Sequence, residues 1–130
     1  MTGPPATGDV DPEEFRRQAH RVADWIADYL AGIEALPVVP DVAPGDVAAL
    51  LPAEPPAGPE SMDAILADLD RVIVPGTTHW AHPRFHAWFT SSGSGPGILG
   101  EIVASTLNVN GMTWRSAPSA TELERVTLDW

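Results

Sequence analysis

Aromatic rings and imidazoles gather in one short segment of the chain, residues 79–89. Its members are two tryptophans, two phenylalanines and three histidines: Trp80, Trp88, Phe85, Phe89, His79, His82 and His86. Rings beside polar groups make a surface that can hold a flat ligand with polar substituents. The same residues could instead form a local core that joins two helices, and the segment alone favours neither interpretation.

The three histidines raise the question of a metal site. They are spaced three and four residues apart, which would place them on one face of a helix as ligands. Pro83 disfavours a helix at His82, however, and no nearby carboxylate completes a ligand set. We therefore expect no metal ion here and predict hydrogen-bonded histidines in a wet cleft.

A loop of serines and glycines, residues 91–95, follows the aromatic segment. Free backbone N–H groups in front of a helix could bind an anion there. The loop lacks the glycine and lysine spacing of a P-loop, and a hinge or tight turn is the commoner role of such a run. No Ser/His/Asp triad or glutamate pair is recognisable either. The residues thus predict a recognition surface without catalytic residues.

The overall charge limits the classes of partner. Seven basic and 18 acidic residues give a formal net charge of −11, which argues against nucleic acid and against an anionic membrane surface. The first residues do not read as a signal peptide, and no apolar run is long enough to span a bilayer. With no cysteine for disulfides, these features predict a cytoplasmic protein. All seven basic residues are arginines, so the chain contains no lysine.

The aromatic segment lies between predicted helices. Asp11 and Pro12 mark the start of a helix over about 12–35, with apolar residues recurring every three or four positions. Ser61 can cap a second helix, which Pro75-Gly76 ends. Between the second and third helices, we expect a turn and then a short extended piece.

Two further helices are predicted after the serine and glycine loop. The first opens at Ser94 or Gly95. The last begins at Pro118, where Ser119 and Glu122 have the spacing of a capping box. The chain ends at Trp130 in the middle of an apolar pattern, from which we expect a fragment or one half of a larger protein.

The remaining segments are irregular. Residues 1–10 read as a flexible tail. Residues 37–59 carry seven prolines and are predicted to hold neither a helix nor an inner strand. Their valines and leucines are unusual for a solvated linker, so we expect this stretch to run extended across another surface.

Motifs along nearly the whole chain are familiar in combination. They are the helix EEFRRQAHRVADWIADYL (13–30), the turn PVVPDVAPG (37–45), VIVPGTTHW (72–80), HPRFHAWF (82–89) and NGMTWRSAPSATELE (110–124). With them the chain resembles the N-terminal segment of the group II pyridoxal-phosphate-dependent amino-acid decarboxylases. This family acts on aromatic amino acids and histidine.

The resemblance implies a fold and a division of the chain. It implies an all-α chain: a helical dimerisation arm over 11–90 that wraps a partner subunit, then the start of the large cofactor domain over 91–130. That domain, of the α/β fold type I transferases, would be truncated at residue 130. The partners implied are an amino-acid substrate and either a second copy, as an intertwined homodimer, or a chain that carries the cofactor domain.

The resemblance also implies site residues. The substrate side chain would be flanked by Trp80, Trp88, Phe89, Thr90 and Ser91. Asn110 and Met112 match a loop that reaches across the dimer into the neighbouring site. The family's common Phe-Pro-Thr reads Phe89-Thr90-Ser91 here, and Asn110 and Met112 replace apolar residues, so a more polar pocket is expected.

The missing lysine limits the chemistry. Pyridoxal 5′-phosphate (PLP) enzymes attach the cofactor through a lysine amine. By the resemblance, that lysine and the side chains that hold the ring lie beyond residue 130. The chain is therefore expected to contain no catalytic or cofactor-binding residue, to hold no metal and to be inactive alone. It is either the N-terminal fragment or small subunit of such a decarboxylase, or a non-enzymatic helical interaction module derived from one.

Overall fold

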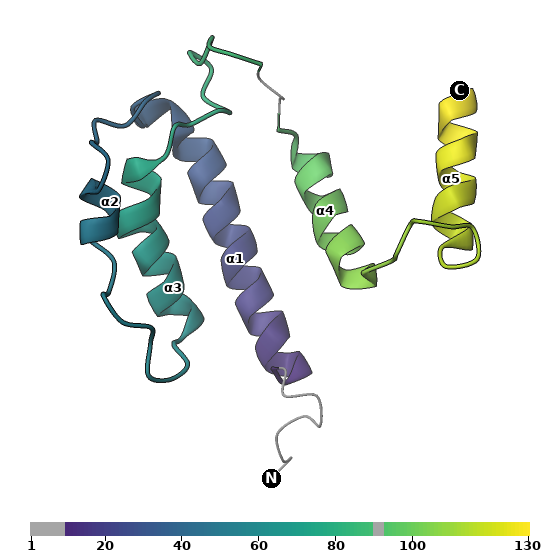
Figure 1. Cartoon of the computed structure of the whole chain (residues 1–130), viewed down its shortest axis with the longest axis horizontal. Helices are drawn as coiled ribbons and strands as arrows, with labels where there is room; N and C mark the ends of the chain where they lie inside the picture. Colours follow the sequence, from purple (N-terminus) through teal and green to yellow (C-terminus); the bar gives the residue numbers. More distant parts are fainter. Residues whose placement is uncertain (1–9, 90–92) are drawn as a thin grey trace. The chain divides into compact units, whose positions relative to one another are not determined.

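The computed structural model describes residues 10–89 and 93–130, and every regular element in these stretches is helical (Figure 1). The all-α prediction for this chain is confirmed. The chain divides into two compact units, Met1–Thr90 and Ser91–Trp130. The predicted flexible tail falls on residues outside the described range, apart from residue 10. No helix in the described stretches is long and apolar enough to cross a bilayer.

The longest helix, α1 (Pro12–Gly32), begins where the sequence signals place it. The Asp11 carboxylate accepts a hydrogen bond from the backbone N–H of Glu13 (2.9 Å), and Pro12 occupies the first helical position. One 3₁₀ turn, η1 (Ile33–Ala35), continues from its end. The predicted helix over about 12–35 is therefore confirmed.

The second helical stretch of this unit consists of three consecutive elements. These are α3 (Met62–Asp68), the π-helix η2 (Leu69–Ile73) and the 3₁₀ turn η3 (Val74–Gly76). The Ser61 hydroxyl accepts from the backbone N–H of Ala64 (3.2 Å), which confirms Ser61 as the cap. The wider π-helical turn was not predicted from the sequence.

Helix α1 and the stretch from α3 to η3 lie side by side and run in the same direction (Figure 1). Successive turns of α1 meet successively later residues, through the contacts Arg21–Asp63, Trp25–Asp70 and Tyr29–His79. The connection over residues 36–61 must therefore run back along α1 from its end to the level of Arg21.

That connection contains one element that the sequence analysis excluded. The prediction that 37–59 holds no helix is wrong at α2 (Asp46–Ala49), a single helical turn. Gly45 precedes it with a φ of 104°, a conformation that favours glycine. The Asp46 carboxylate accepts from the backbone N–H of Ala43 (2.7 Å) and closes the turn. No proline lies between residues 45 and 51, so nothing prevents this turn.

The second unit contains two helices. The helix α4 (Gly95–Leu107) begins at Ser94, whose hydroxyl accepts from the backbone N–H of Gly97 (3.1 Å), as predicted. It ends at Asn108, in the left-handed conformation that asparagine tolerates (φ 45°).

The last helix, α5 (Pro118–Asp129), begins at the predicted residue but without the predicted cap. The cap position is Ala117, which offers no side-chain hydrogen bond, so the capping box of Ser119 and Glu122 is wrong. Glu122 instead accepts from Nε1 of Trp114 (3.1 Å).

Few side chains are buried in either unit. The buried apolar residues are Ile33, Val72, Phe85 and Ala117, joined by the imidazoles of His79 and His82. Large apolar side chains are exposed on both units, among them Phe15, Val39, Leu50, Leu51, Leu99, Val103, Leu107, Leu123 and Trp130. The described residues therefore present much more apolar surface than they bury, as is typical of a surface that other protein covers.

Candidate functional site

The aromatic segment folds as two successive turns after η3. The backbone N–H of His82 donates to the carbonyl of His79, and that of Phe85 donates to the carbonyl of His82 (both 2.9 Å). Trp88 then has a φ of 51°, in the left-handed region that a bulky side chain rarely occupies. The predicted turn is confirmed, and the chain bends again at residues 87–88 after it.

Three rings of this segment form one cluster. The centroid of Trp80 lies 5.0 Å from that of Phe85 and 5.7 Å from that of Trp88, and Phe85 lies 5.9 Å from Trp88. Phe85 is buried, whereas Trp80 is 47% and Trp88 74% exposed. The cluster thus combines the two interpretations left open by the sequence. Phe85 is a local core, and the two indoles present ring surface outward.

The remaining members of the predicted substrate wall are only partly described. Phe89 is 97% exposed and has no ring contact with the cluster in the described residues. Thr90 and Ser91 lie outside the described residues. The structure thus brings Trp80 and Trp88 together and leaves Phe89 apart from them.

The predicted cross-subunit loop belongs to the second unit. The side-chain oxygen of Asn110 accepts from the backbone N–H of Met112 (3.0 Å). The backbone carbonyl of Asn110 accepts from the hydroxyl of Ser116 (2.9 Å). Asn110 therefore shapes the loop between α4 and α5. Met112 is exposed and free to contact another surface.

His79 is one of the most buried side chains and is held from several directions. Its Nδ1 lies 2.7 Å from the hydroxyl of Tyr29, and its backbone N–H donates to the carbonyl of Val38 (3.1 Å). When Nε2 carries the proton of the ring, Nδ1 accepts the proton of the Tyr29 hydroxyl. Burial raises the pKa of Tyr29, which keeps this hydroxyl protonated.

The protonation of His79 should make the first unit sensitive to acid. Burial is the main cause that lowers the pKa of His79 below its usual 6.5, and the nearby His82 lowers it further. The backbone of Val74 opposes this shift only in part. The unfolded chain thus takes up the proton first. His79 contributes full stability above about pH 6.5, and this is lost as pH falls through the lowered pKa. We expect a lower urea midpoint at about pH 5 than at about pH 7.5.

His79→Asn is the control for this pH dependence, because asparagine does not titrate. The difference between the two urea midpoints should shrink in this variant. An undiminished difference would assign the acid sensitivity to other groups.

His82 is buried as well. Its Nδ1 accepts from the backbone N–H of Arg84 (3.0 Å), so a neutral ring carries its proton on Nε2. That Nε2 is buried and has no hydrogen-bond partner among the described residues. An unmatched buried donor costs about 1–3 kcal/mol.

The prediction that the histidines lie in a wet cleft is wrong for two of the three. His79 and His82 are buried, and only His86 is exposed. In residues 10–89 and 93–130, no group of three or more histidine or acidic side chains is placed to hold a metal ion.

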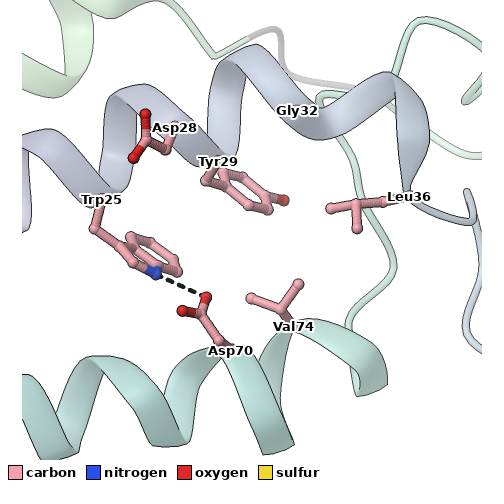
Figure 2. A pocket seen from close by; sticks show the side chains of 7 residues that line it. All are labelled: Trp25, Asp28, Tyr29, Gly32, Leu36, Asp70 and Val74. Atoms are coloured by element: carbon pink, nitrogen blue, oxygen red, sulfur yellow. Dashed lines mark hydrogen bonds between the residues drawn. The ribbon is translucent and has the colours of Figure 1, made fainter.

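A cavity of about 300 Å³ lies between α1 and the helical stretch from α3 to η3, away from the predicted site residues. Figure 2 shows Trp25 and Tyr29 projecting from α1 toward Asp70 and Val74. The Trp25 and Tyr29 rings are stacked, with centroids 5.6 Å apart and planes 5° from parallel. Trp25 Nε1 donates to the Asp70 carboxylate (2.8 Å). No short-range pattern in the sequence links Trp25 with Asp70, because the two positions lie 45 residues apart.

Comparison with known proteins adds a family match. Residues 44–130 match the pyridoxal-dependent decarboxylase conserved domain. The chain is 48% identical over 125 residues to Tyrosine/DOPA decarboxylase 3 of Papaver somniferum, covering 96% of the chain and 24% of that protein.

Two solved structures are similar over nearly the whole chain. The tryptophan decarboxylase of Catharanthus roseus, in complex with L-tryptophan, matches with a TM-score of 0.87 and 44% identity, over 93% of this chain and 25% of that one. The TDC of Oryza sativa, with PLP and tryptamine, matches with a TM-score of 0.88 and 39% identity, over 99% of this chain and 26% of that one. The chain thus spans about a quarter of the length of these relatives.

Proposed function

The chain belongs to the pyridoxal-dependent decarboxylase family, and from this membership we propose that it supplies the N-terminal part of an aromatic amino-acid decarboxylase. In this role it provides dimer contacts and one wall of the substrate pocket. The observation that carries the proposal is the match, with a TM-score of 0.88, to a quarter of an enzyme solved with PLP and tryptamine.

The cofactor of this family is PLP, and the residues present do not suffice to hold it. PLP supplies the electron sink for loss of the carboxyl group when it is bound. It is attached through a lysine amine, and this chain has no lysine. The attachment site must therefore come from another part of the protein or from a partner chain. The role of these 130 residues is to bind and orient the substrate.

The exposed indoles support an aromatic substrate. Trp80 and Trp88 present ring surface outward, and offset or tilted contact with a substrate ring is favourable there. Phe89 would add a further exposed ring, and Thr90 and Ser91 would add hydroxyl groups for a polar ring substituent. The named relatives act on tyrosine, DOPA or tryptophan, and we extend that class of substrate to this chain.

The exposed apolar side chains support a dimer. Val39, Leu50 and Leu51 in the proline-rich connection are at least half exposed, and a second subunit would bury them. Asn110 and Met112 would then reach the neighbouring pocket. The net charge of −11 is consistent with a cytoplasmic enzyme that binds neither nucleic acid nor anionic membrane.

A chimera tests this function directly. Residues 1–130 would replace the matching N-terminal quarter of the Papaver somniferum decarboxylase, and amine release from L-tyrosine, L-DOPA and L-tryptophan would be measured. We expect activity within about tenfold of the parent for at least one of these substrates. The 130-residue chain alone should form no lysine-linked PLP Schiff base, which absorbs at about 420 nm, because it has no lysine to attach the cofactor.

The parent enzyme without its N-terminal quarter is the matched control and should be inactive. A folded, PLP-loaded chimera that releases no amine would contradict the pocket role. It would favour the alternative, a helical interaction module that takes no part in catalysis. An absorbing adduct on the isolated chain, away from its N-terminal amine, would contradict the assignment of cofactor attachment to another segment.

A further inference from the structure

His79 is the point at which the aromatic cluster is joined to α1. Its ring meets the Tyr29 hydroxyl (2.7 Å), and its backbone N–H donates to the carbonyl of Val38 (3.1 Å). Its own carbonyl accepts from the N–H of His82 and closes the turn that carries Trp80. Two residues that are distant in sequence, Tyr29 and Val38, and the local turn to His82 therefore fix His79.

Tyr29 is itself held rigidly. Its ring stacks on Trp25, and Trp25 is anchored by the hydrogen bond from its Nε1 to the Asp70 carboxylate (2.8 Å) (Figure 2). A ring fixed in this way presents its hydroxyl in one direction, so little side-chain entropy is lost when the bond to His79 forms.

The effect of His79 reaches the cluster through the next residue. Trp80 follows His79 directly and packs on Phe85 and Trp88. His79 is buried whereas Trp80 is half exposed, so the two side chains leave the backbone toward different environments. Holding the buried His79 imidazole in place therefore fixes the position of the exposed Trp80 indole.

We propose that Tyr29 and His79 are a positioning pair that holds the Trp80–Phe85–Trp88 cluster in place for the substrate ring. This role rests on the proposed function, since it presumes that the cluster is a pocket wall. Tyr29 makes no ring contact with any member of the cluster, so it acts through His79.

Kinetics of the enzyme that contains this chain test the pair. Tyr29→Phe removes only the hydroxyl and keeps the stacking on Trp25. We expect KM for the preferred aromatic amino acid to rise about fivefold while kcat stays within about twofold, because the lost bond loosens the pocket wall and not the reacting groups. His79→Asn, whose amide oxygen can take the place of Nδ1 as acceptor, should keep KM near that of the unaltered enzyme. His79→Leu, which cannot accept, should match Tyr29→Phe.

Arg21→Ala is the matched control, because it breaks the ion pair with Asp63 that also joins α1 to the second helical stretch, and Arg21 contacts neither Tyr29 nor His79. An equal rise in KM in this variant would overturn the specific role of the pair, as would an unchanged KM in Tyr29→Phe. If the unaltered protein is active, these outcomes concern the positioning role alone. If it releases no amine, the proposed function fails and this role fails with it.

Discussion

Val72→Asp is expected to unfold the first unit. Val72 is 2% exposed and lies in the π-helix η2, on the stretch that packs against α1. A carboxylate there would lose its hydration without gaining a cationic partner. The cost is at least about 4 kcal/mol, comparable with the whole stability of a small domain. The measurement is urea unfolding followed by far-UV circular dichroism at neutral pH.

The neighbouring residue offers a matched control for this substitution. Ile73 belongs to the same turn and is 42% exposed, so the carboxylate of Ile73→Asp can remain in water. Its urea midpoint should stay close to that of the unaltered chain. Equal midpoints for the two variants would show that Val72 does not belong to a core.

Phe85→Ala should destabilise the protein and Phe89→Ala should not, although the residues are only four positions apart. Phe85 is buried against Trp80 and Trp88, so truncating it leaves a cavity and costs about 3 kcal/mol. Phe89 is 97% exposed, so Phe89→Ala should change the free energy of unfolding by less than about 0.5 kcal/mol. Denaturation followed by tryptophan fluorescence measures both.

Activity separates the two phenylalanines a second time. If Phe89 lines the substrate pocket, Phe89→Ala should lower kcat/KM for an aromatic amino acid about tenfold while the protein stays as stable as before. A loss of stability in Phe89→Ala, or none in Phe85→Ala, would show that the core and the pocket wall have been assigned the wrong way round.

The starts of the helices could be predicted because their signals are local. Asp11, Ser61 and Ser94 each accept a hydrogen bond from a backbone N–H two or three residues later, and each was recognised as a cap or helix opening. The same rule failed at Ser119, because Pro118 already occupies the first helical turn and moves the cap to Ala117. The helical turn α2 was not predicted, because the prolines of residues 37–59 argue against a helix, although residues 46–51 contain none.

The surroundings of the histidines could not be predicted from local patterns. His79 is buried because Tyr29 and Val38 reach it from 50 and 41 positions away, counted as 79 − 29 and 79 − 38. No pattern within residues 79–89 indicates those partners, so the sequence alone predicted a wet cleft. The motif resemblance identified the family correctly, and it was silent on the Tyr29–His79 contact because that contact joins two separate motifs.

The parallel course of α1 and the stretch from α3 to η3 also affects how fast this unit can fold. The contacts that join them lie 42 (63 − 21) and 45 residues apart in sequence. An antiparallel helix pair can close through a few residues, whereas here about 40 residues must close into a loop before the first contact forms. Individual helices form within about a microsecond, so the slow event is the search of one preformed helix for the other.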